Sequence, residues 1–229
     1  MPLVQLAHEV RQAGERRTLE EPATGDRRPL ASRQTGWAAR LTALALRTPI
    51  TPNMVSCLGL AFATLGAVCF AFAPERLWLF LAGAVLVQLR LVCNLIDGMV
   101  AVEGRRGGPT GVLFNELPDR YEDAVLLAGF AYAGGVRDWG FVAGVLAVGT
   151  AYLRAVGASL GLGQDFRGPM AKPQRMALLT AGAVIAFAER LALGTLHSPR
   201  WIIALAIAGT VITCGRRIRR MAARLSVGT

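Results

Sequence analysis

The sequence has few of the residues that equip a soluble domain. Only 17% of its 229 residues are charged, whereas a soluble domain has about 25%. Its cysteines stand singly in apolar stretches and its histidines are isolated, so the sequence predicts neither a disulfide framework nor a zinc site. These residues are Cys57, Cys69, Cys93, Cys214, His8 and His197. The composition therefore excludes an ordinary soluble domain.

The N-terminal segment lacks the apolar core of a signal peptide. Met1 to Ser32 is polar, and we interpret residues 1–34 as a flexible cytoplasmic tail. The next segment alternates Trp37, Leu41 and Leu44 with Arg40 and Arg47, which is typical of an amphipathic helix lying on a membrane surface. The following "TPITPN" ends that helix, and Thr51 or Asn53 can cap the helix that begins there.

Apolar residues are what the chain has in abundance, at 53% of the total with a mean hydropathy of +0.43. Segments long enough to cross a bilayer, about 20 residues each, recur along it. The clear ones are Val55–Ala73, Leu77–Ile96, Trp139–Gly161, Met176–Gly194 and Trp201–Gly215. A sixth, Gly111–Ala133, is apolar only in its second half. The sequence thus predicts an all-α integral membrane protein with six transmembrane helices over residues 35–220, followed by a short cytoplasmic tail, 221–229.

The net charge of +10 raises the possibility of nucleic-acid binding, but the positions of the basic residues oppose it. On the six-span arrangement, 18 of the 25 basic residues fall on one side of the membrane. This is the positive-inside pattern, so we expect both termini and both polar loops to be cytoplasmic in a multi-pass protein of the cell membrane.

Several acidic and amide side chains nevertheless lie beside the apolar runs. Asn94 and Asp97 are about 60° apart on a helix, and Asn115, Asp119 and Asp123 step by about 40°, so each set shares one face. The two helices are joined by a short loop, and their polar faces can meet near the cytoplasmic surface. Converging oxygen ligands suit Mg²⁺ or Mn²⁺. The structural alternative is that these acids form buried ion pairs with Arg90, Arg120 or Arg154.

The spacing from Asn94 to Asp119 resembles that of the CDP-alcohol phosphatidyltransferases, which are membrane enzymes with six transmembrane helices. Their motif reads D-x2-D-G-x2-A-R-x8-G-x3-D-x3-D. The matching positions are Asn94, Asp97, Gly98, Ala101, Val102, Gly111, Asn115 and Asp119, without insertion or deletion. "TPN" before the first span extends the resemblance to about residues 35–220.

The resemblance implies transfer of a phosphatidyl group from a CDP-linked lipid, such as CDP-diacylglycerol, to an acceptor alcohol with release of CMP, in phospholipid biosynthesis. It implies Mg²⁺ or Mn²⁺ as cofactor and a homodimer. By position, Asp97, Asp119, Asn94 and Asn115 would be metal ligands, with Asp119 also the catalytic base. Gly98, Ala101 and Gly111 would line the nucleotide pocket.

Three departures from the motif leave alternatives open. Asn94 and Asn115 replace aspartates and add no negative charge, and Val102 replaces the arginine. An enzyme with one metal, an enzyme in which Glu103, Glu116, Glu122 or Asp123 serves as a ligand, and a non-catalytic relative that binds CDP-lipid or anionic lipid all remain possible. A small transporter using Asp97 and Asp119 is disfavoured by the cytoplasmic position of both carboxylates.

Basic residues lie on the same side of the membrane as the motif. The second polar loop contributes Arg167, Lys172 and Arg175, and Arg154 lies within the fourth span. The resemblance implies that Arg154, Lys172 and Arg175 contact substrate phosphate, and an acceptor with its own phosphate, such as glycerol phosphate or inositol phosphate, would suit them. Topology alone could also account for the loop residues.

Overall fold

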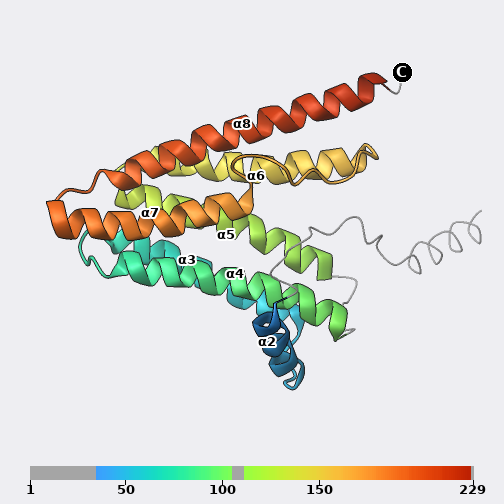
Figure 1. Ribbon diagram of the computed structural model, residues 1–229, viewed down its shortest axis with the longest axis horizontal. Helices are drawn as coiled ribbons and strands as arrows, with labels where there is room; N and C mark the ends of the chain where they lie inside the picture. The colour runs from blue at the N-terminus through green and yellow to red at the C-terminus, as the bar shows by residue number, and fades with distance from the viewer. Residues whose placement is uncertain (1–34, 105–110, 228–229) are drawn as a thin grey trace, which may run out of the picture.

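The computed structural model of the protein describes residues 35–104 and 111–227. The expected tail, residues 1–34, lies outside the described residues, as do 105–110 and 228–229. The described part is helical (Figure 1). Its helices are α2 (Gly36–Leu46), α3 (Pro52–Phe72), α4 (Leu79–Glu103), α5 (Gly111–Ala133), α6 (Arg137–Ser159), α7 (Lys172–Leu193) and α8 (Ser198–Val227).

Five of these helices, α3, α4, α6, α7 and α8, are long and apolar enough to cross a membrane. They correspond to the five clear predicted spans. The sixth predicted segment coincides with α5, which has 23 residues but does not meet the same criterion of length and composition. α8 is longer than predicted, because it continues as one helix of 30 residues to Val227, through most of the expected C-terminal tail.

The helix boundaries follow local signals in the sequence. Thr51 is the N-cap of α3, and its hydroxyl accepts a hydrogen bond from the Met54 amide at 3.3 Å, as predicted. Pro52 stands in the first turn, where no amide is needed. α7 ends at Leu193, and its C-cap is Gly194, whose φ of 69° is a left-handed conformation that glycine adopts without steric cost.

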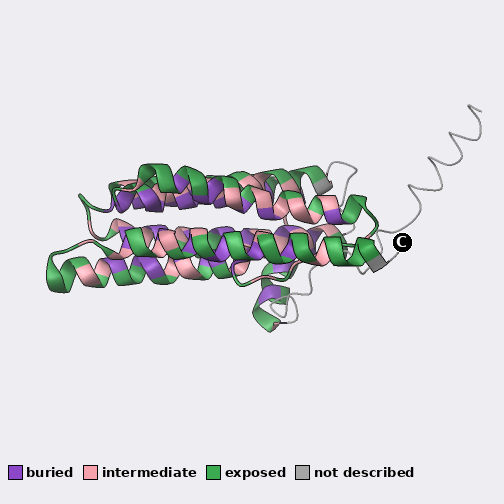
Figure 2. Cartoon of the chain, turned by 90° about the horizontal axis from the view of Figure 1, so that it is seen from above, coloured by how far each residue is buried: buried purple, intermediate pink, exposed green. Residues whose placement is uncertain are grey.

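The helices run side by side as a bundle, with α2 crossing it near one end (Figure 1). The α3–α4 and α7–α8 connections lie at the left end in that view, and α4 and α8 both finish at the right end. α5 occupies the interior, because it contacts α3, α4, α6, α7 and α8. Buried residues gather where helices face one another, and exposed residues cover the outside (Figure 2).

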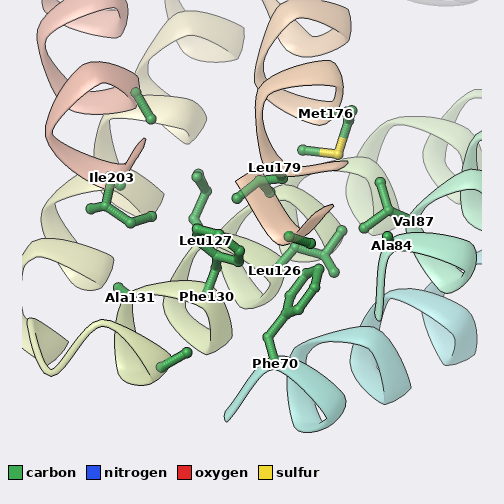
Figure 3. Close-up of a cluster of buried hydrophobic side chains, with 14 of the residues drawn as sticks. Phe70, Ala84, Val87, Leu126, Leu127, Phe130, Ala131, Met176, Leu179 and Ile203 are labelled. Atoms are coloured by element: carbon green, nitrogen blue, oxygen red, sulfur yellow. The ribbon is translucent and has the colours of Figure 1, made fainter. Parts of the chain in front are cut away.

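The apolar core lies toward the end of the bundle away from the polar motif. Phe70, Phe80 and Phe130 meet edge to face, with ring centroids 5.1 Å apart for Phe70–Phe130 and 6.3 Å for Phe80–Phe130. Leu126, Leu127, Met176, Leu179 and Ile203 pack into the same buried cluster (Figure 3). α5 is thus apolar at its C-terminal end, which anchors the helix while its N-terminal half remains free to carry polar groups.

Close approach of α3 and α5 depends on a glycine. A Cβ atom at Gly129 would lie 2.3 Å from the carbonyl oxygen of Ala67. We therefore expect Gly129→Ala to destabilise the fold by about 1–3 kcal/mol, the usual range for overpacking. Thermal unfolding in detergent measures it. Gly149→Ala in α6 is the matched control, since nothing lies within 4 Å of its added methyl group. Equal melting temperatures for the two variants would contradict the packing argument.

Candidate active site

The polar motif is assembled from α3, α4 and α5. The Asn94 side-chain amide in α4 donates to Asp119 Oδ1 in α5 at 2.5 Å, so the prediction that the two polar faces meet is confirmed. Asp97, one turn further along α4, is buried and accepts a hydrogen bond from the Ser56 hydroxyl of α3 at 2.7 Å. The side chain of Asn115 lies outside the described residues.

Asp119 is surrounded by positive charge. Lys172, the first residue of α7, forms an ion pair with Asp119 Oδ1, the oxygen that also receives the Asn94 amide. One terminal nitrogen of Arg90 lies 3.6 Å from the same oxygen, and Arg120 lies 3.8 Å from Oδ2. The Asp119 side chain remains 17% exposed. This carboxylate is therefore largely neutralised while it keeps access to a substrate.

Arg90 links the site to the interior of the bundle. Its side chain is fully buried, and its Nε donates to Glu122 Oε2 at 2.5 Å. Its terminal nitrogen donates to Asp123 Oδ1 at 2.9 Å, and Arg175 donates to the other oxygen of Asp123 at 2.6 Å. Buried ion pairs, the structural alternative, thus account for Glu122 and Asp123. Arg90 precedes Asn94 by four residues, about one helical turn, and this spacing in the sequence indicates that both side chains face the same site.

Glu116 forms a second ionic group beside the first. It accepts from Arg154 of α6 at 2.6 Å and from Arg120, four residues later in α5. The guanidinium of Arg154 also lies 5.1 Å from the ring centroid of Phe166. Two arginines thus share one carboxylate, which leaves a net positive charge at the partly exposed edge of the site.

Arg175 was predicted to contact substrate phosphate, but its side chain is buried inside the protein. It is 3% exposed, and besides Asp123 it donates to the Met170 carbonyl at 2.9 Å. Lys172 and Arg154 retain partial exposure, with side chains 21% and 18% exposed. The predicted nucleotide residues Gly98 and Ala101 are partly exposed near the end of α4, and Gly111 begins α5 with open space around it.

The capacity of the site to hold a divalent metal depends on which carboxylate oxygens remain free. Asp97 Oδ1 and Glu122 Oε1 are buried without a hydrogen-bond partner. Among the other carboxylates that could serve as metal ligands, Glu103 is exposed, and Glu116 and Asp123 form ion pairs with arginines. Residues 35–104 and 111–227 contain no cluster of three or more His, Cys, Asp or Glu side chains that could hold a metal. This set does not form an all-protein cage, but it fits one ion held by Asp97 together with substrate phosphates, a common arrangement for Mg²⁺.

The loop between α6 and α7 is fastened to α8 by arginines. Arg217 donates to the carbonyl of Thr150 at 2.6 Å and to that of Arg167 at 3.2 Å, and Arg220 donates to Asp165 at 2.9 Å. Partial burial raises the pKa of Asp165, but hydrogen bonds from Arg167 and Arg220 outweigh it and lower that pKa to about 2. The α8 arginines, which the positive-inside pattern explains only as markers of topology, therefore hold the loop that leads into Lys172.

Comparison with known proteins agrees with this architecture. No model of a protein family matches the chain. It is 30% identical over 192 residues to a phosphatidylinositol phosphate synthase of Mycolicibacterium smegmatis, covering 80% of this chain and 82% of that one. A Streptomyces avermitilis protein of the same name is 28% identical and is covered to 80%. A bifunctional IPC transferase and DIPP synthase of Rubrobacter xylanophilus is 32% identical over 171 residues, but the match spans only 38% of that longer protein.

Solved structures share the fold. Mycobacterium tuberculosis phosphatidylinositol phosphate synthase with CDP-DAG bound superposes with a TM-score of 0.66 over 80% of this chain and 92% of that one, at 22% identity. The same enzyme in complex with manganese and citrate gives 0.68 over 80% and 88%.

The fold and the site define a multi-pass membrane protein with an ionic site enclosed among its helices. The chain belongs to the CDP-alcohol phosphatidyltransferase family, as the motif from Asn94 to Asp119 predicts. It is accordingly an enzyme of phospholipid biosynthesis that transfers a phosphatidyl group from a CDP-linked lipid to an alcohol.

Proposed function

We propose that the donor is CDP-diacylglycerol and that the acceptor is a phosphorylated polyol, inositol phosphate foremost. The observation that carries this proposal is the excess of positive charge beside Asp119, where Arg120 and Arg154 share Glu116 and Lys172 reaches Asp119 itself. A phosphate on the acceptor would be held by such groups. The names of the bacterial relatives support the same acceptor.

The proposed reaction assigns one role to each part of the site. The acceptor hydroxyl oxygen bonds to the phosphorus that carries the lipid, the bond from that phosphorus to CMP breaks, and Asp119 takes the hydroxyl proton. Asn94 holds Asp119 in position through its amide hydrogen bond. Mg²⁺ or Mn²⁺, when bound, would neutralise the pyrophosphate. Asp97 is its proposed ligand, through Oδ1. Asn94, Asn115 and Asp119, the last through Oδ2, would be the further oxygen donors of the motif.

Different residues would contact the nucleotide of the donor and the phosphate of the acceptor. Gly98, Ala101 and Gly111 have no bulky side chain and would let the nucleotide approach the backbone. Arg154 and Lys172, which are partly exposed, would bind acceptor phosphate. For Arg175 we propose a positioning role instead, because its burial and its bonds to Asp123 and Met170 keep it away from substrate.

The membrane arrangement is also part of the proposal. α5 would be the sixth span, since its buried acids are paired with Arg90 and Arg175 rather than exposed to lipid. α2, with Trp37 and Leu44 exposed, would lie on the membrane surface. The site would open on the cytoplasmic side, both termini would lie on that side, and the enzyme would form a homodimer.

The test is CMP release from CDP-diacylglycerol by purified protein with Mg²⁺ or Mn²⁺ and a panel of alcohols. We expect inositol phosphate or glycerol phosphate to be used, and the matching unphosphorylated alcohol to be used poorly. We also expect Arg154→Gln to raise the KM for the phosphorylated acceptor at least about tenfold, because a charged hydrogen bond contributes about 1.5–3 kcal/mol.

Arg137→Gln is the matched control for that variant. Arg137 is also in α6 and also faces an aromatic ring, Tyr132 at 4.1 Å, but it stands at the opposite end of the helix. Equal KM values for the two variants would contradict acceptor binding by Arg154. Absence of CMP release with every alcohol, with CDP-lipid still bound, would contradict the proposed reaction and favour a lipid-binding protein.

A further inference from the structure

Lys172 is the only lysine in the sequence; the other 24 of the 25 basic residues are arginines. It begins α7, and its side chain crosses to α5 to form the ion pair with Asp119. Arginines supply the other positive charges of this site, including the two that lie near Asp119. The position of the one lysine against the motif carboxylate therefore raises the question of what a lysine does there that an arginine does not.

The chemistry of the two side chains differs at this point. An arginine is a planar, delocalised cation that pairs with carboxylates through a fork of donors. A lysine ammonium is a compact point charge, which is closer in size and charge distribution to a bare metal ion. At Asp119 Oδ1 the ammonium occupies an oxygen that would otherwise be available to a metal.

The charges around the site leave little room for two divalent ions. The acidic side chains of the site are matched in number by basic ones. The five acids are Asp97, Glu116, Asp119, Glu122 and Asp123, and the five bases are Arg90, Arg120, Arg154, Lys172 and Arg175. One divalent ion would bring this group to a net charge of about +2, and two would bring it to about +4 before substrate binds. With aspartates at positions 94 and 115 the balance would be two units more negative.

The carboxylate oxygens that have no partner also favour a single divalent ion. Asp97 Oδ1 is buried and has no partner, whereas both oxygens of Asp119 lie near cations. The Asn94 amide also donates to Asp119, so its nitrogen rather than its oxygen faces that carboxylate. Asp97 therefore retains the capacity to ligate a metal, and Asp119 has already received a positive charge from the protein.

We propose that the Lys172 ammonium takes the place of a second divalent cation at Asp119, so that this enzyme works with one divalent ion, held at Asp97. This inference rests on the proposed function, in which a divalent ion assists the transfer. It also accounts for the two asparagines of the motif, because a monovalent ammonium needs fewer carboxylates than a second divalent ion.

Mn²⁺ titration of the full-length protein in detergent, followed by electron paramagnetic resonance with CDP present, tests this directly. We expect wild-type protein to bind one Mn²⁺ per chain, with no spectrum of a spin-coupled pair. The variant Asn94→Asp/Asn115→Asp should still bind one ion, more tightly, because Lys172 remains on Asp119. Adding Lys172→Gln to that variant should admit a second ion and produce the coupled spectrum.

Three results would overturn the inference. They are a coupled pair in the wild type, a coupled pair in the double variant that keeps Lys172, and a single ion in the folded triple variant. The wild-type result needs no variant to fold, and Arg167→Gln, which removes an exposed charge of the same loop, controls for general loss of charge.

CMP release from the same preparations separates this inference from the proposed function. One bound ion without CMP release would contradict the reaction, while a coupled pair with CMP release would contradict only the role of Lys172.

Discussion

Asp97→Asn is expected to lower the rate of CMP release by about 10³-fold, because the divalent ion that Asp97 would hold neutralises the pyrophosphate and stabilises the transition state by several kcal/mol. The change is nearly isosteric, and the hydroxyl of Ser56 can still donate to the remaining oxygen at this position. Asp97 Oδ1 is buried without a hydrogen-bond partner, so the substitution breaks no hydrogen bond to this oxygen. Steady-state CMP release and Mn²⁺ affinity should fall together while the melting temperature stays near that of the wild type.

Asp138→Asn provides the control, since Asp138 is an exposed acid in the first turn of α6, at the other end of the bundle. It should leave CMP release within about twofold, as surface substitutions usually have small effects. Retention of most activity by Asp97→Asn would exclude Asp97 as the metal ligand. A large drop in melting temperature with unchanged Mn²⁺ affinity would assign Asp97 a structural role instead.

Arg90→Met is expected to produce the largest loss of stability, about 3–5 kcal/mol, because removing one partner of a buried ion pair leaves uncompensated charge in the interior. Arg90 is fully buried and pairs with Glu122 at 2.5 Å and Asp123 at 2.9 Å. Methionine preserves much of the side-chain volume, so the effect would report charge rather than a cavity. Denaturation of the detergent-solubilised protein, followed by circular dichroism, measures it.

Two variants define what Arg90 contributes. Arg90→Met/Glu122→Gln should recover part of the loss, because the carboxylate left without a partner is replaced by a neutral amide. Arg76→Met removes an exposed arginine at the opposite end of the bundle and should have little effect. If Arg90→Met is no less stable than Arg76→Met, the buried network does not hold α4 and α5 together.

Much of the architecture was predictable because it depends on local properties of the chain. Hydropathy and length located the five spans, and the proline and threonine at residues 51–52 marked the start of α3. Helical periodicity placed Asn94 and Asp119 on faces that meet. The full length of α8 was not predicted, because its last turns are too polar to be recognised as part of a span although the helix continues through them.

The partners of the charged residues were not predictable in the same way. The spacing of the motif identified Asp97 and Asp119 as neighbours, but Lys172 is 53 residues beyond Asp119 in the sequence and reaches it only because α7 begins beside α5. Arg175, expected to contact substrate, is instead buried against Asp123. Arg217, expected to mark topology, binds the loop before α7 through the Arg167 carbonyl and α6 through the Thr150 carbonyl.

Hydropathy, capping and helical periodicity act over a few residues, and for that reason the class of protein, the positions of its helices and the polar faces of the motif follow from the sequence. The pairing of the charged side chains, and with it the oxygen of the motif that is left free, follows from the packing of the helices. Ion pairs depend on distances between segments far apart in the chain, and those distances exist only once the helices are packed.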